Sequence, residues 1–237
     1  MKNTLMAIRL PAAAAALSLM CPALGLANEE KADNLTQSAL GMDAHPDSGK
    51  IQFERSCSRC HGQHAEGDDA RLAPALAGQR FVYLVRQMSN FGAAERDNAA
   101  MYHVVSAARL AEPQVWNDIA AYLNRLPVTE VAETGAGTTV ALGRGIFHEQ
   151  CASCHSADAS GDKEGFVPSL RNQHYQYLVS QLHGLADGHR RNGDPSLALF
   201  MRSFDAADMV AVADYLSRQQ GKATSHEHML GNGVVVN

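Results

Sequence analysis

Two stretches of the chain place apolar residues at the spacing of an amphipathic helix. The first runs from Phe81 to Phe91, with Leu84, Val85 and Met88 between them. The second begins near Pro113, which is favourable in a first helical turn, and ends before Pro127. Its apolar residues are Val115, Ile119, Tyr122, Leu123 and Leu126. No segment alternates apolar and polar residues as a strand would, so we predict an all-α fold.

The same pattern occurs twice. Gly49 and Gly143 lie 94 positions apart, and so do many other pairs. These pairs are Phe53 and Phe147, Cys57 and Cys151, Pro74 and Pro168, Leu76 and Leu170, Gln79 and Gln173, Tyr83 and Tyr177, Leu84 and Leu178, and Gln87 and Gln181. In the last helix the offset falls to 93, between Tyr122 and Tyr215. A repeat with one small insertion or deletion predicts two tandem copies of one small helical domain.

The composition between and around the copies sets the domain boundaries. We assign the first domain to 49–127 and the second to 143–218, joined by a Thr-, Ala- and Gly-rich linker at 128–142. The polar segments at 28–48 and 219–237 show no clear period, so we expect a flexible lead-in and a flexible tail.

The first 27 residues have the pattern of a secretory signal peptide. Lys2 and Arg9 are basic, the run from Leu10 to Met20 is apolar, and small residues precede a cleavage site after Ala27. We therefore expect export to the periplasm. The alternative is an uncleaved N-terminal anchor. No later run is long and apolar enough to span a bilayer.

The chemistry of the chain is concentrated in two Cys-x-x-Cys-His motifs. They read C-S-R-C-H at 57–61 and C-A-S-C-H at 151–155. This is the pattern for covalent attachment of a c-type haem. The two thiols of one helical turn reach the two vinyl groups of a porphyrin, and the following His supplies an iron ligand. The predicted cofactors are two covalently bound haem c groups, attached through Cys57 and Cys60 and through Cys151 and Cys154, with His61 and His155 on the irons.

Two other interpretations of four cysteines are weaker. In an exported protein the usual one is two disulfides, but a pair within one helical turn would constrain almost nothing. A shared zinc site would need the pairs about 15–20 residues apart. Here Cys60 and Cys151 are far more widely separated.

The charge excludes one class of partner. The formal net charge is −5, and removal of a signal peptide carrying Lys2 and Arg9 would make it −7. An acidic protein is not expected to bind nucleic acid.

The order of motifs resembles that of class I cytochromes c, and the doubled form is similar to the di-haem cytochrome c4 family. Besides the haem motifs, the resemblance rests on two repeated stretches, Pro-x-Leu-x-x-Gln and Tyr-Leu-Val-x-Gln, at Pro74 to Gln87 and Pro168 to Gln181. The resemblance implies a small helical bundle around each haem. It also implies that the backbone carbonyls of Pro74 and Pro168 accept a hydrogen bond from the proximal histidines.

The family supplies the sixth iron ligand from a Met that lies before the last helix. In the first domain Met101 has this position, and His103 is an alternative two residues later. In the second domain Leu197 has the expected position, and the nearest Met is Met201. We assign Met201 as the ligand. The alternatives are a His, such as His183 or His189, and a five-coordinate iron.

These features predict an electron carrier and not an enzyme. Its partners would be redox proteins, such as a membrane respiratory complex or a terminal oxidase or reductase, and peripheral membrane association is compatible with the sequence. The alternative is a haem enzyme, or a gas- or peroxide-binding protein, that uses an open sixth position on the second haem.

Overall fold

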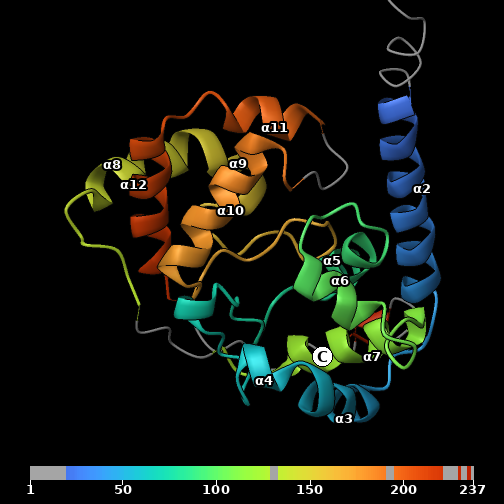
Figure 1. The fold of residues 1–237 in the computed structure, drawn as a ribbon. Helices are drawn as coiled ribbons and strands as arrows, with labels where there is room; N and C mark the ends of the chain where they lie inside the picture. Colours follow the sequence, from blue (N-terminus) through green and yellow to red (C-terminus); the bar gives the residue numbers. More distant parts are fainter. Residues whose placement is uncertain (1–19, 129–132, 191–194, 221–228, 231–233, 236–237) are drawn as a thin grey trace, which may run out of the picture.

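The computed structural model describes residues 20–128, 133–190, 195–220, 229–230 and 234–235. Figure 1 shows two groups of helices side by side, one from each predicted copy. The first unit consists of α3 (Pro46–Ser56), α4 (Ser58–His61), the 3-10 turn η1 (Asp69–Arg71), α5 (Phe81–Gly92), α6 (Ala99–Val105) and α7 (Pro113–Arg125). The second unit consists of α8 (Val140–Ile146), the π-helical turn η2 (Phe147–Cys151), α9 (Ala152–His155), α10 (Tyr175–Asp187), α11 (Pro195–Met201) and α12 (Ala206–Ser217). The predicted all-α fold of two tandem domains is confirmed.

Each unit is closed by its first and last helices, which cross at a glycine. A Cβ atom added to Gly49 of α3 would lie 2.0 Å from the carbonyl oxygen of Asp118 in α7. A Cβ atom on Gly143 of α8 would lie 1.8 Å from the carbonyl oxygen of Ala211 in α12. The backbones therefore touch at the crossing, and only glycine fits there. One turn after each glycine a fully buried phenylalanine enters the core, Phe53 in one unit and Phe147 in the other.

Helix α2 (Met20–Leu40) corrects the sequence prediction for residues 28–48. We expected a flexible lead-in, but the chain is helical to Leu40 and packs against α5 and α7 of the first unit, along its outer side in Figure 1. Its buried residues Ala32, Thr36 and Ala39 lie four and three positions apart, on one helix face. Leu35 and Leu40 of the same helix also pack against the apolar clusters of the first unit. The fully buried positions of α2 are small, so the helices approach closely there.

Charged side chains of α2 also contact the first unit. Asp33 forms an ion pair with Arg86 of α5, and Lys31 Nζ donates a hydrogen bond to the carbonyl of Gly92. The predicted signal peptide at 1–27 lies mostly outside the described residues. Within the described part of the chain, no helix combines the length and apolar character needed to cross a bilayer.

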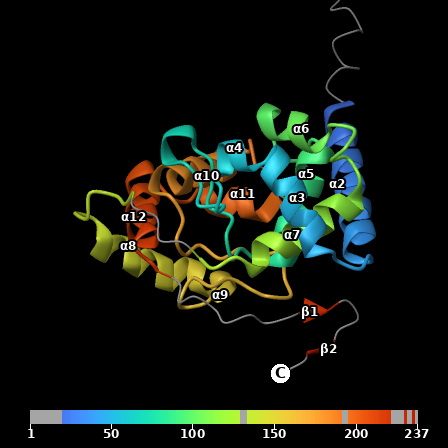
Figure 2. The ribbon, with the colours of Figure 1, turned by 90° about the horizontal axis from the view of Figure 1, so that it is seen from below.

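The predicted linker and tail also differ in detail from the structure. Helix α8 begins at Val140, inside the predicted linker at 128–142. In the predicted flexible tail, strands β1 (Met229–Leu230) and β2 (Val234–Val235) pair antiparallel and lie to one side of the helices in Figure 2. Valine favours extended backbone. The polar, Gly-rich composition of the whole tail hid this local preference from the sequence analysis.

The two units contact each other through equivalent residues. The side-chain amide of Gln173 accepts a hydrogen bond from the backbone N–H of Ala75 (2.9 Å) and donates one to its carbonyl (3.0 Å). Gln79 makes the same two bonds to Ser169, at 2.9 Å each. Because Ala75 and Ser169 occupy matching positions in the repeat, the exchange is reciprocal, as in an isologous interface.

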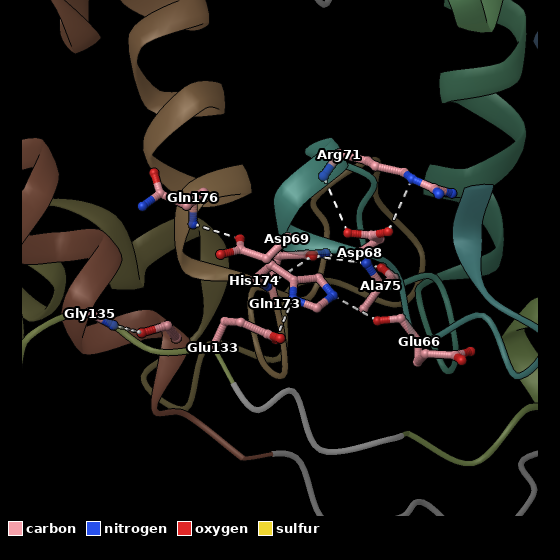
Figure 3. Close-up of polar contacts among 11 residues, drawn as sticks. Glu66, Asp68, Asp69, Arg71, Ala75, Glu133, Gly135, Gln173, His174 and Gln176 are labelled. Carbon is pink, nitrogen blue, oxygen red and sulfur yellow. Dashed lines mark hydrogen bonds and ion pairs between the residues drawn. The ribbon is translucent and has the colours of Figure 1, made fainter.

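A second pair of contacts flanks these amides. Arg80 donates from Nε (2.8 Å) and Nη2 (2.6 Å) to the carbonyl of Ser160. The matching residue, His174, places Nε2 at 2.8 Å from the carbonyl of Glu66 and Nδ1 at 3.1 Å from the carboxylate of Glu133. Figure 3 shows the ring of His174 held between these two residues.

Two arginines complete the contact between the units. The main chains of Arg96 and Arg190 form an isolated antiparallel bridge. Arg96 donates to the hydroxyl of Tyr177 (2.9 Å), and Arg190 donates to the hydroxyl of Tyr83 (2.8 Å). Both also donate to the side-chain oxygen of Gln181, at 2.5 and 3.0 Å. The two units thus form one body whose halves are related by an approximate two-fold axis.

Candidate functional site

The first Cys-x-x-Cys-His motif lies where helix α3 passes into the single turn α4. The N–H of Cys57 donates to the carbonyl of Phe53 (2.8 Å), and the N–H groups of Cys60 and His61 donate to the carbonyl of Cys57 (3.1 and 3.0 Å). This tight turn places both thiols on one side, as the motif predicts. The second motif lies at the passage from the π-helical turn η2 into α9, where the N–H of Ala152 donates to the carbonyl of Phe147.

The two motif histidines are held in the same way. His61 Nδ1 lies 3.1 Å from the carbonyl oxygen of Pro74, and His155 Nδ1 lies 3.2 Å from that of Pro168. A carbonyl only accepts, so Nδ1 carries the proton and donates it. The lone pair of Nε2 is then available to a metal, and the hydrogen bond fixes the orientation of the ring.

The loops that carry the proline carbonyls share several backbone hydrogen bonds, although η1 occurs in the first loop and not in the described second one. The N–H of Gly67 donates to the carbonyl of His61 (2.9 Å), and the N–H of Gly161 donates to that of His155 (2.8 Å). Both glycines have positive φ, +85° and +72°, which other residues rarely adopt. The proximal side is therefore equally well formed in both units.

Burial controls the protonation of these groups. Burial raises the pKa of the Cys57 thiol to about 11, with a smaller contribution from the nearby Cys60. Burial also raises the pKa of the Cys151 thiol to about 11, with a smaller contribution from Cys154. Burial also lowers the pKa of His61 and of His155, against the opposing effect of the proline carbonyls. At neutral pH the thiols of Cys57 and Cys151 are protonated and the two imidazoles are neutral, so the histidines are ready to bind a metal.

The weaker interpretations of the cysteines do not fit this structure. Cys57, Cys60, Cys151 and Cys154 are all free thiols. Among the described residues, no group of three or more His, Cys, Asp or Glu side chains is close enough to hold a metal ion. This excludes a zinc site shared by the two cysteine pairs.

The residues present fit two covalently bound haem groups. In each unit two free thiols on one turn would form the thioether bonds, and a neutral imidazole with a fixed ring would bind the iron. A haem held in this way supplies a one-electron ferric–ferrous couple.

Met101, the candidate sixth ligand of the first unit, lies near the start of α6. Asn98 caps this helix and accepts a hydrogen bond from the N–H of Met101 (3.0 Å). The Met101 side chain is half-buried in a cluster with Phe91 and Trp116. Met88 packs against this cluster and also against the core cluster to which Cys57 belongs. Met88 therefore links the surroundings of the candidate distal ligand to those of the haem-binding cysteine.

The second unit has a corresponding arrangement around Met201. Met201 ends helix α11, is 7% exposed and packs in a cluster with Ala186 and Met209, which Leu197 borders. Leu182 packs against this cluster and also against the one that contains Cys151. Leu182 is the repeat counterpart of Met88. Met201 thus belongs to a cluster bridged by Leu182 to that of Cys151, as Met101 belongs to one bridged by Met88 to that of Cys57, although the sequence offset between the two methionines is not that of the repeat.

The histidine alternatives lie elsewhere. His103 and His189 are both exposed and line a polar surface cavity of about 460 Å³ between the units, together with Tyr102. An exposed imidazole in a polar cavity is a poorer candidate for an axial ligand than a thioether packed among apolar side chains. His183 is half-buried on α10.

Known proteins with this arrangement are c-type cytochromes. A sequence model of the cytochrome c family matches residues 140–220. The thiosulfate dehydrogenase electron acceptor of Stutzerimonas stutzeri is 30% identical over 200 residues, which cover 79% of this chain and 90% of that protein. Cytochrome c4 of Pseudomonas aeruginosa is 30% identical over 176 residues, which cover 68% of this chain and 82% of the relative.

The chain belongs to the di-haem cytochrome c4 family.

The fold agrees with this assignment. The crystal structure of reduced cytochrome c4 from Pseudomonas stutzeri superimposes with a TM-score of 0.66 at 21% identity, covering 75% of this chain and all of that one. The family resemblance, the two haem c cofactors and the electron-transfer function predicted from the sequence are thereby confirmed.

Sequence reasoning did not find the contacts between the units. Gln79 and Gln173 were recognisable as a repeated pair, but their partners are main-chain groups of the other unit. Arg96 and Arg190 also lie 94 positions apart. This offset was a usable signal, because an arginine that recurs at the repeat spacing points to a position that both copies use.

Proposed function

We propose that this protein carries single electrons between periplasmic redox proteins and does not turn over a substrate of its own. The observation that supports this most is the identical construction of the two proximal sites, in which His61 and His155 donate to Pro74 and Pro168. Two equivalent one-electron centres in one body suit a relay. The chain contributes residues that would attach each haem covalently and hold its proximal histidine in a fixed orientation.

The partners we propose are a donor dehydrogenase and a terminal oxidase or reductase. One relative is named as the electron acceptor of thiosulfate dehydrogenase, which supports an enzyme of inorganic sulfur oxidation as donor. We also propose that residues 1–27 are removed on export. Mass spectrometry of the protein from the periplasmic fraction would then give an N-terminus at Asn28. A protein that retains Met1 and sediments with membranes would contradict the cleavage.

We propose Met101 and Met201 as the sixth ligands, which leaves neither iron open. The competing function, a haem enzyme or a gas- or peroxide-binding protein, rests on Leu197 in the position where the family has its methionine. The burial of Met201 in a cluster joined through Leu182 to that of Cys151 supports the closed coordination instead.

Changing either methionine to alanine tests this proposal. We expect Met101→Ala and Met201→Ala each to convert one of the two haems to a high-spin form that binds carbon monoxide when reduced, because a thioether ligand is lost. Absorption and electron paramagnetic resonance spectra of the ferric protein measure the change.

Packing controls accompany these variants. Met88→Ala and Met209→Ala remove methionines of the same two clusters and should leave both haems low-spin. If Met209→Ala changes the spectrum and Met201→Ala does not, the assignment of Met201 is wrong. A high-spin haem in the unchanged protein would favour the enzyme or gas-binding alternative.

A further inference from the structure

Two adjacent residues of the second unit, Gln173 and His174, hold the loop that carries the first proximal site. Gln173 pairs with both main-chain groups of Ala75, directly after the proline carbonyl that orients the proximal histidine. His174 contacts the other end of that loop, where its Nε2 lies 2.8 Å from the carbonyl oxygen of Glu66. The second unit therefore touches the first proximal loop at both of its ends.

The contact of His174 lies one residue away from the backbone of the proximal histidine's partner. Glu66 is followed by Gly67, whose N–H donates to the carbonyl of His61 (2.9 Å). The ring of His174 packs so close to this glycine that an added Cβ atom would lie 2.6 Å from Nε2. A change of charge on the His174 ring therefore acts on the backbone to which His61 is bonded.

Both ring nitrogens of His174 face hydrogen-bond acceptors. Nε2 faces the Glu66 carbonyl, and Nδ1 lies 3.1 Å from the carboxylate of Glu133. A neutral imidazole has one N–H and can donate to one of them, so the two contacts together require one additional proton. The His174 side chain is 6% exposed and that of Glu133 is 50% exposed. Because water stabilises the charge of the half-exposed carboxylate, the additional proton belongs to the ring.

The other charged groups near His174 are engaged elsewhere. In Figure 3 the carboxylate of Glu66 points away from the ring, and it accepts from a backbone N–H of its own loop (2.8 Å). Asp69 of η1 accepts from a backbone N–H of α10 (3.0 Å), and Asp68 pairs with Arg71 (3.3 Å). The ion pair of the ring is therefore formed with the segment between the two units.

This segment, which carries Glu133, is held against the second unit by α12. Four residues after Glu133, the N–H of Gly137 donates to the carboxylate of Asp214 (2.8 Å). Asp214 also pairs with Arg218 (3.0 Å), so its charge is already compensated. The pair of His174 and Glu133 is thus placed by the second unit, although it contacts the loop of the first.

The matching contact of the first unit uses a side chain that stays charged. Arg80 occupies the position of His174 in the repeat and donates to the carbonyl of Ser160, the counterpart of Glu66. A guanidinium is not deprotonated in proteins. The second proximal loop therefore faces a permanent charge, whereas the first faces a charge that depends on pH.

We infer that His174 is a positioning residue through which a proton bound by the second unit raises the reduction potential of the first haem. This inference rests on the proposed electron-carrier function. With the proton, the charges of the ring and of Glu133 cancel; without it, the carboxylate charge remains and favours the more positive ferric iron. On reduction the iron gains one electron from the redox partner, and the pair takes up at most one proton from water. By linkage, reduction strengthens proton binding by the same factor.

Redox titration of the full chain with both haems tests the inference, with NMR of the haem methyl groups to follow the two haems separately. The range is about pH 5 to 8, in which histidines change charge. We expect the potential of the first haem to fall as the pH rises through this range. At a fixed solution potential, its ratio of reduced to oxidised form should fall about five-fold, the lower end of typical coupling between two sites. The haem carboxylates also titrate, so the contribution of His174 is measured as the difference between variants.

Three variants fix the charge of the pair. His174→Arg carries the permanent charge of Arg80, so the first haem should keep its low-pH potential throughout. His174→Gln is neutral, so the first haem should keep its high-pH potential. Glu133→Gln lets a neutral ring satisfy both partners, because an amide can donate to Nδ1, and should remove most of the pH dependence.

A control and a transplanted residue accompany these variants. His64 is an exposed histidine of the same loop, and His64→Gln should leave the pH dependence unchanged. Arg80→His should give the second haem a pH dependence, because it places a titratable ring beside the carbonyl of Ser160. Nitrogen-15 NMR of the His174 ring at low pH should show a proton on both nitrogens.

The same pH dependence of the first haem in wild type, His174→Arg and His174→Gln would overturn the inference. A His174 ring with a single proton throughout the range would also overturn it. If the His174 variants do not fold, an unchanged pH dependence in Glu133→Gln, whose side chain is half-exposed, has the same meaning. If neither wild-type haem is reversibly reduced at any pH, the electron-carrier proposal fails instead.

Discussion

Replacing Gly143 with valine is expected to destabilise the second unit by about 3 kcal/mol or more. A Cβ atom at this position would lie 1.8 Å from the carbonyl oxygen and 2.4 Å from the carbonyl carbon of Ala211. Both atoms belong to the backbone of α12, which cannot move aside as a flexible side chain would. Helices α8 and α12 would have to separate, which would open the core around Phe147. Thermal denaturation followed by circular dichroism and by haem absorption measures the loss.

A neighbouring glycine provides the control. Gly145 lies on the same helix, and a Cβ atom there would meet nothing within 4 Å. Gly145→Val makes the same chemical change and should leave the melting temperature nearly unchanged. Gly49→Val should repeat the effect in the first unit, where the crossing partner is Asp118. Equal stability of the Gly143 and Gly145 variants would show that the helices do not cross as closely as described.

Replacing Gln173 with leucine should cost about 3 kcal/mol, because each buried polar group left unpaired costs about 1–3 kcal/mol. Leucine is similar in size but satisfies neither the N–H nor the carbonyl of Ala75, and both Gln173 and Ala75 are buried between the units. Hydrogen exchange at the Ala75 amide should accelerate, since this N–H loses its acceptor. Chemical denaturation of the whole protein measures the change in the free energy of unfolding.

Two further glutamine variants serve as controls for Gln173→Leu. Gln176 lies on the same segment but is exposed, and in Figure 3 its amide points away from His174. Gln176→Leu should have little effect on stability. Gln79→Leu should match Gln173→Leu, because its bonds to Ser169 are the reciprocal set. A stable Gln173→Leu variant with a protected Ala75 amide would contradict the described contact.

The sequence by itself determined the local features of this protein. Covalent haem attachment depends on residues within one helical turn. Cys57, Cys60 and His61 and their repeat counterparts could therefore be identified from the sequence alone. Helices α5 and α7 were predicted because their apolar residues follow the helical period. The repeat offset of 94 revealed two domains, each with its own core, because a repeat can be recognised without any long-range contact.

Only the tertiary structure decided the features that depend on contacts between distant segments. Helix α2 was missed because its fully buried residues Ala32, Thr36 and Ala39 are small, so only Leu35 and Leu40 mark its packed face among polar neighbours. The placement of Met201 beside Leu182 was hidden by a shift in the repeat before the last helix. The spacing of apolar residues in the sequence shows which face of a helix is apolar. Which helix packs against that face is decided only by the three-dimensional packing.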